Sequence, residues 1–140
     1  MRHLIERVLE LSDEEIVPQL DPQPNGQGTD EELRALLESL QPRIRVYGVG
    51  GAGCNAVGRL DAEGLFENSF VTGYAINTDA QALLMSPLEH KVLIGRTARG
   101  RGAGGDPTKG EAAALESEMA LRGITTDTQL AIIAAGMGGG

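Results

Sequence analysis

Four short runs of glycine and small polar residues hold most of the chemistry that this sequence offers. They cover residues 50–53, 77–80, 95–106 and 136–140, and are called here the first to fourth runs. Small residues let the main chain approach a phosphate closely, and a helix that follows presents free N–H groups and the positive end of its dipole. One such contact contributes about 0.3–1 kcal/mol. The runs therefore favour a phosphate-bearing ligand.

The first run lies within the sequence GVGGAGCN at residues 48–55. It also fits G-x-G-x-x-G, which is typical of dinucleotide sites, so a nicotinamide or flavin site is an alternative. Such a site places an acid at the tip of the second strand, where this chain has Asn77, with Asp79 two residues later. A P-loop is excluded because no G-K-[ST] follows the glycines. The remaining alternative is a tight strand–helix turn without a ligand.

The second and third runs bring polar groups and cations. Asn77, Thr78 and Asp79 offer an amide, a hydroxyl and a carboxylate, which suit a ribose, a phosphate or a magnesium-bound water. Equally, Thr78 or Asp79 could cap the next helix. The third run combines glycines with arginines and can wrap a terminal phosphate, or it is a solvated surface loop. Its arginines, which we expect to face solvent or a partner, are Arg96, Arg99 and Arg101.

Composition narrows the class of function. The chain of 140 residues has a net charge of −8, which disfavours nucleic acid and anionic membrane surfaces as partners. No apolar stretch is long enough to cross a membrane, so we expect no direct membrane insertion. The single cysteine, Cys54, excludes an intrachain disulfide and is expected to be a packing residue. The two histidines, His3 and His90, indicate no metal site.

Strands and helices alternate from residue 42 onward. We expect strands at 43–49, 70–77, 91–95 and 129–135, and helices at 54–63, 78–85 and 107–122. Asp106 should cap the last helix and Gly123 should end it. This alternation predicts an α/β fold with a Rossmann-like parallel sheet, in which the four runs meet at the carboxyl edge.

The region before residue 42 differs in character. It predicts a helix at 2–10, a proline- and glycine-rich linker at 18–28, and a second helix from Thr29. Thr29 and Glu32 fit a capping box. Residues 1–41 are therefore predicted to be a helical N-terminal extension and residues 42–140 the ligand-binding domain. The second helix carries an apolar stripe made of Leu33, Leu36, Leu37 and Leu40.

Four sequences together resemble the tubulin/FtsZ GTPase family, and its prokaryotic FtsZ branch in particular: GVGGAGCN at 48–55, AINTDAQALL at 75–84, RGRGAGGDP at 99–107 and AAGMGGG at 134–140. The helix beginning at Thr29 is similar to N-terminal extensions of archaeal members. The resemblance covers residues 43–140 and implies GTP or GDP as ligand, Mg²⁺ beside Asp79, and the spatial strand order 3-2-1-4.

The resemblance also assigns site residues. The first run with its neighbours would contact the guanosine diphosphate portion, the second run the phosphates and Mg²⁺, the third run the γ-phosphate, and the fourth run begins the family's signature glycine loop. In that order the residues are Gly50, Gly51, Ala52, Gly53, Cys54 and Asn55; Asn77, Thr78 and Asp79; Gly102, Ala103, Gly104, Gly105 and Asp106; and Gly136, Gly138, Gly139 and Gly140.

By this resemblance the chain is a cell-division protein that forms head-to-tail filaments with itself, hydrolyses GTP between subunits, and acts in the cytoplasm with division-site proteins. The sequence stops within the signature loop and lacks the family's catalytic acidic loop. We therefore expect a truncated chain that is inactive alone, weakly stable and weak in GTP binding, with an exposed apolar strand at 129–135. The alternatives are a dinucleotide-binding domain and a non-catalytic fragment that caps filaments.

Overall fold

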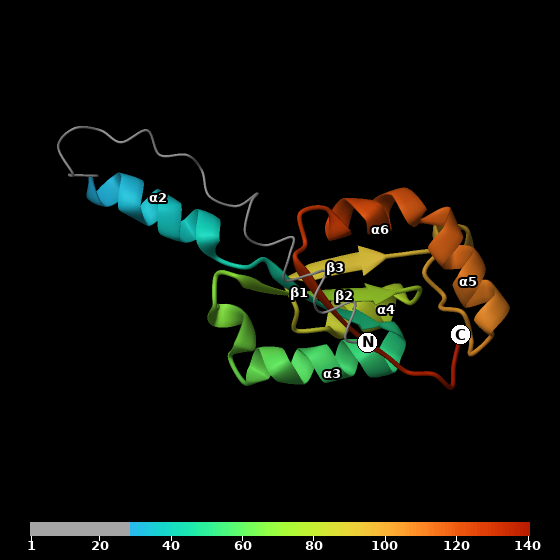
Figure 1. Cartoon of the computed structure of the whole chain (residues 1–140). Helices are drawn as coiled ribbons and strands as arrows, with labels where there is room; N and C mark the ends of the chain where they lie inside the picture. The colour runs from blue at the N-terminus through green and yellow to red at the C-terminus, as the bar shows by residue number, and fades with distance from the viewer. Residues whose placement is uncertain (1–28) are drawn as a thin grey trace, which may run out of the picture. The chain divides into compact units, whose positions relative to one another are not determined.

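The computed structural model describes residues 29–140 (Figure 1). The chain divides between Ser39 and Leu40 into two units, which are described separately. The predicted helix at 2–10 and the linker at 18–28 lie outside the described residues. Within the described part, no helix combines the length and apolarity needed to cross a bilayer.

Helix α2 (Asp30–Leu40) begins as the sequence predicts. Thr29 N–H donates to Glu32 Oε2 at 3.0 Å, and Glu32 N–H donates to Thr29 Oγ1 at 3.3 Å, so the capping box is confirmed. Acidic residues in the first turn also suit the positive end of the helix dipole. No residue of α2 is buried, and Leu37 is 62% exposed.

The second unit is built on a four-stranded sheet whose strands are all parallel, as predicted. Its strands are β1 (Ile44–Val49), β2 (Val71–Asn77), β3 (His90–Leu93) and β4 (Leu130–Ala135), in the order β3-β2-β1-β4. Val49 pairs with Ile76 on one side and with Ala135 on the other, so β1, β2 and β4 end side by side.

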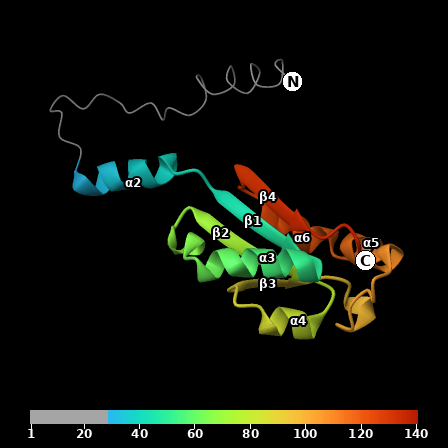
Figure 2. The same ribbon diagram turned by 90° about the horizontal axis from the view of Figure 1, so that it is seen from below.

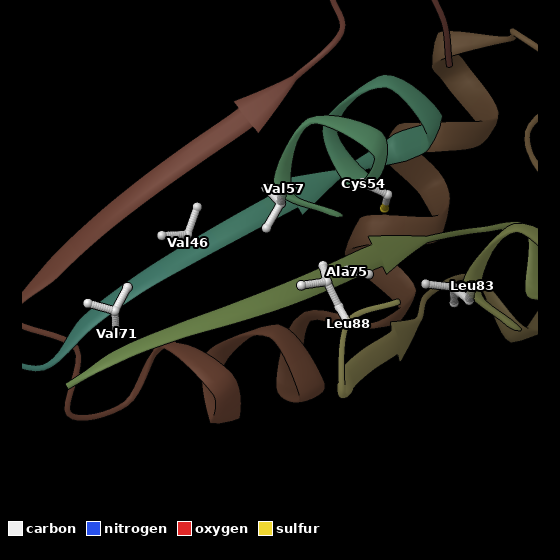
Figure 3. Close-up of a cluster of buried hydrophobic side chains, with 7 residues drawn as sticks. All are labelled: Val46, Cys54, Val57, Val71, Ala75, Leu83 and Leu88. Atoms are coloured by element: carbon white, nitrogen blue, oxygen red, sulfur yellow. The ribbon is translucent and has the colours of Figure 1, made fainter. Parts of the chain in front are cut away.

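Helices cover both faces of this sheet (Figures 1 and 2). Helix α3 packs on one face, while α5 and α6 lie on the other. Neighbouring residues of a strand point to opposite faces, so Val46 joins the core beneath α3 (Figure 3) and Tyr47 joins the core beneath α5 and α6. The helical elements are α3 (Gly50–Ala62), η1 (Leu65–Glu67), α4 (Ala80–Met85), η2 (Arg96–Ala98), α5 (Pro107–Glu116) and α6 (Glu118–Thr125).

Several predicted boundaries are wrong. Helix α3 begins at Gly50, directly after β1, so the first run is the first helical turn rather than a loop before Cys54. Strand β3 begins and ends earlier than predicted, at His90 and Leu93. The long helix predicted at 107–122 is interrupted at Ser117, and Gly123 lies inside α6 instead of ending it.

Strand β4 lies at the edge of the sheet and is poorly covered, as the resemblance to the family implies. Leu130 is 50% exposed, Ile132 48% and Ile133 68%. An apolar strand with an unpaired edge is prone to pair with another chain.

Candidate functional site

The register of the sheet brings the four runs to one edge. The first run follows β1, the second run begins at the last residue of β2, and the fourth run follows β4. Contacts between the runs show that they meet there.

The glycines in the first run and at the end of β1 are of two kinds: some pack against the sheet and others face open space. A Cβ on Gly53 would collide with the carbonyl oxygen of Ala134, and one on Gly48 would lie 2.6 Å from the Gly53 oxygen. These two glycines therefore let α3 sit tightly on β1 and β4. In contrast, a Cβ on Gly50 or Gly51 would meet nothing within 4 Å. The open side of this helical turn carries N–H groups that have no partner within the helix.

The fourth run contacts both the first and the third. A Cβ on Gly136 would lie 3.0 Å from Ala52 Cβ. At the other end, a Cβ on Gly140 would lie 2.7 Å from the carbonyl carbon of Asp106. Between these contacts, Gly138 and Gly139 face open space. The fourth run thus bridges the N-termini of α3 and α5 with its own glycines exposed.

Main-chain hydrogen bonds join the second run to the third. Gly102 N–H donates to the Thr78 carbonyl at 3.2 Å, and Ala80 N–H donates to the Gly100 carbonyl at 3.1 Å. The buried Asn77 fixes the turn, because its Oδ1 accepts from Asp79 N–H at 3.1 Å. The four runs therefore form a continuous chain of contacts along the carboxyl edge.

Asp79 is the residue that caps α4. Its Oδ1 accepts from Gln81 N–H at 2.8 Å and from Ala82 N–H at 3.1 Å. Within residues 29–140 no group of three or more potential His, Cys, Asp or Glu ligands gathers around a metal position. Mg²⁺ is commonly held by one or two carboxylates together with substrate phosphates and water. The lone carboxylate of Asp79 fits that mode of binding.

The third run needs glycine to follow its path. Positive φ angles occur at Gly100, Gly102, Gly104 and Gly105, where residues with a side chain are strained. Ala103 is buried, whereas Gly104 and Gly105 open to space. The run ends at Asp106, which caps α5 by accepting from Thr108 N–H at 3.0 Å, as predicted.

Cys54 and Asn55 have different surroundings. The buried Cys54 thiol donates toward the carbonyls of Gly48 and Ile76 at 3.4 and 3.5 Å, and burial raises its pKa. The Cys54 side chain packs in the core beneath α3 (Figure 3). Only the main chain of Cys54 is therefore left to contact a ligand. Asn55 is exposed and lines a groove of about 440 Å³ between α3 and α4.

Two residues that sequence reasoning missed hold the third run from the far end of α5. Glu116 carboxylate oxygens accept from Thr97 N–H at 3.1 and 3.4 Å, and Ser117 Oγ accepts from Gly95 N–H at 3.0 Å. The partners are 19 and 22 residues apart in sequence. No local pattern signals such a contact.

A parallel sheet whose carboxyl edge gathers four runs of glycine and small polar residues defines a Rossmann-like α/β domain, a class that places its ligands at this edge. Residues 43–140 match the family model described as "Tubulin/FtsZ family, GTPase domain". This chain belongs to the tubulin/FtsZ GTPase family, and the resemblance in the sequence is confirmed.

Sequence identity to individual proteins supports the same family assignment. The chain is 44% identical over its whole length to cell division protein FtsZ 1 of Pyrococcus abyssi, covering 37% of that protein. It is 41% identical over 86% of its length to FtsZ 1 of Halobacterium salinarum, covering 30% of it. The chain thus spans about a third of the length of these relatives.

Solved structures show the same fold. The structure of an FtsZ W319Y mutant from M. jannaschii matches 79% of this chain and 33% of its own, with a TM-score of 0.69 and 42% identity. CetZ2 from Haloferax volcanii, a GTPγS-bound protofilament, matches 70% of this chain and 31% of its own with a TM-score of 0.58 and 28% identity.

Proposed function

We propose that this chain is the phosphate-binding part of a GTP-binding cell-division protein. The observation that supports it most is the chain of contacts among the four runs. It aligns the N-terminus of α3, the turn at Asn77 and the glycines of the third and fourth runs at one sheet edge. Main-chain N–H groups at such an edge suit the phosphates of a nucleotide.

Within this proposal each run has a part. The open first turn of α3, with Gly50 and Gly51, binds the diphosphate together with Gly138 and Gly139. The third run binds the γ-phosphate through Gly104 and Gly105. Asp79 lies beside the third run and holds Mg²⁺ through the phosphates, with Asn77 and Thr78 keeping the turn in shape.

Asp106 adds a carboxylate next to the proposed γ-phosphate position. That charge is partly balanced, because Asp106 caps α5 and its Oδ2 lies 4.0 Å from Lys109 Nζ. We therefore expect the carboxylate to weaken binding of a terminal phosphate only modestly.

Filament formation belongs to the same proposal. One matched structure is titled as an FtsZ dimer and another as a GTPγS-bound protofilament. We propose that the protein associates with itself and acts with division-site proteins at the site of division in the cytoplasm. Hydrolysis of GTP would then take place between subunits.

Calorimetric titration of the chain with GTP, GDP and NAD tests nucleotide binding. We expect GTP and GDP to bind and NAD to give no heat. Binding of NAD without guanine nucleotides would instead support the dinucleotide alternative that the G-x-G-x-x-G pattern raised.

A matched pair of variants locates the site. Gly51 and Gly123 both lie in helices at positions where a Cβ meets nothing within 4 Å. Gly51→Leu should weaken GDP binding at least tenfold because the side chain fills the space above the α3 N-terminus. Gly123→Leu in α6 should leave GDP affinity unchanged. Equal affinities in the two variants would place the ligand elsewhere.

A further inference from the structure

The third run is attached to α5 at both ends of that helix. At the N-terminal end, Asp106 caps α5 and completes the run. Near the C-terminal end, Gly95 packs against Ala113, where a Cβ on Gly95 would lie 3.1 Å from Ala113 Cα. A helix rises 1.5 Å per residue, so α5 holds the attachment points at Asp106 and Ala113 about 10 Å apart.

Two side chains strengthen the second attachment. The Glu116 carboxylate accepts from Thr97 N–H, and Ser117 Oγ accepts from Gly95 N–H. Hydrogen bonds to a charged acceptor are stronger than neutral ones. Ser117 also occupies the junction between α5 and α6, with φ −103° and ψ 15°. The break in the helix therefore lies at the residue that binds the beginning of the third run.

The rest of the third run has few attachments of its own. Its glycines at 100, 102, 104 and 105 all adopt positive φ, and glycine gains the most conformational freedom when contacts are lost. Two main-chain bonds tie it to the second run, through Gly100 and Gly102. The direction in which Gly104 and Gly105 point thus depends on both ends of the run, which are Asp106 at the cap of α5 and the segment from Gly95 to Thr97.

We propose that Glu116 and Ser117 are positioning residues that set the third run for recognition of a terminal phosphate. Their hydrogen bonds go to the main chain of Gly95 and Thr97, at the opposite end of the run from Gly104 and Gly105, so they act through the main chain. This inference rests on the proposed function. The inference extends the proposed function because it assigns the preference for a triphosphate over a diphosphate to the α5–α6 junction.

The experiment compares GTPγS and GDP affinities of the chain in three variants. Glu116→Ala should lower the affinity for GTPγS relative to GDP about three- to tenfold, the equivalent of one lost hydrogen bond. Glu116→Gln keeps an acceptor oxygen and should restore most of the preference. Glu118→Gln is the matched control, because Glu118 is exposed near the same junction and pairs with Arg122 at 2.7 Å.

Hydrogen exchange of the ligand-free chain gives a second readout. Glu116→Ala should accelerate exchange at Thr97 and along residues 98–105, while Glu118→Gln should not. If wild-type chain prefers GTPγS and Glu116→Ala keeps both that preference and slow exchange, the inference is wrong while the proposed function stands. If wild-type chain binds neither nucleotide, the proposed function fails and the inference with it.

Discussion

Strands β2 and β4 both pair with β1, yet their surroundings differ. Every residue of β2 is buried or half-buried, whereas all residues of β4 except Ala134 are exposed. The two strands flank the same central strand, so strand sequence alone does not decide burial. What differs is coverage: β2 lies between β1 and β3, while β4 has one neighbour. The fold is therefore strongest around β1 and β2 and weakest at β4.

The largest expected difference is in the free energy of unfolding when one side chain is truncated in the core beside β2 and another on β4. Leu88 is 2% exposed in the core beneath α3 (Figure 3), and Ile133 on β4 is 68% exposed. Leu88→Ala should cost about 2–5 kcal/mol of unfolding free energy through a cavity. Ile133→Ala should change it by about 0.5 kcal/mol or less. Urea unfolding measures both, and similar losses would contradict the contrast in coverage.

Two glycines in the first turn of α3 differ in packing in the same way, because Gly53 is closely packed and Gly51 is open. Gly53→Ala forces a methyl group against the Ala134 carbonyl, so α3 must shift from β4, at a cost of about 1–3 kcal/mol. Gly51→Ala meets open space in the same helical turn and should be neutral or stabilising by up to about 1 kcal/mol. Thermal unfolding distinguishes the two, and a destabilised Gly51→Ala would show that this position is not open.

Asp79 allows capping to be separated from metal binding. Asp79→Ala should destabilise the chain by about 0.5–2 kcal/mol because it removes the cap of α4. Asp79→Asn keeps a good capping side chain and should be nearly as stable as wild type. If Asp79 holds Mg²⁺, Asp79→Asn should still lose the Mg²⁺-dependent part of GTP affinity. Unchanged Mg²⁺ dependence would assign Asp79 to capping alone.

The buried thiol of Cys54 should make the stability of the chain depend slightly on pH. Burial raises the pKa of its thiol above the ordinary value of 9.0, so the unfolded chain releases this proton at lower pH than the folded chain. The contribution to stability is complete below pH 9.0 and is lost as pH rises toward the folded-state pKa. Wild type should therefore lose stability above pH 9.0 relative to Cys54→Ala. Parallel pH profiles would contradict this.

Much of the fold follows from the sequence because the signals are local. The alternation of strands and helices, the capping box at Thr29 and the cap at Asp106 each depend on residues a few positions apart. The start of α3 was misplaced because consecutive glycines suggest a loop, although Gly50 and Gly51 here form a helical turn.

The details of the site depend on distant residues. Gly51 and Gly53 look alike in sequence, but only Gly53 lies against Ala134, and that neighbour is supplied by pairing of β1 with β4. Likewise, Ser117 interrupts the predicted long helix where it meets Gly95. Packing glycines and ligand-facing glycines can be told apart only once the sheet is assembled.

We propose, then, that the four runs surround the phosphates of one guanine nucleotide, the first, third and fourth through main-chain N–H groups and the second through the Asp79 carboxylate. Amide hydrogen exchange of the chain with and without GTPγS tests it most directly. We expect exchange to slow on binding in the first turn of α3, at Gly104 and Gly105, and at Gly138 and Gly139. Protection confined to a single run, or absent from the first turn of α3 while the nucleotide is bound, would contradict it.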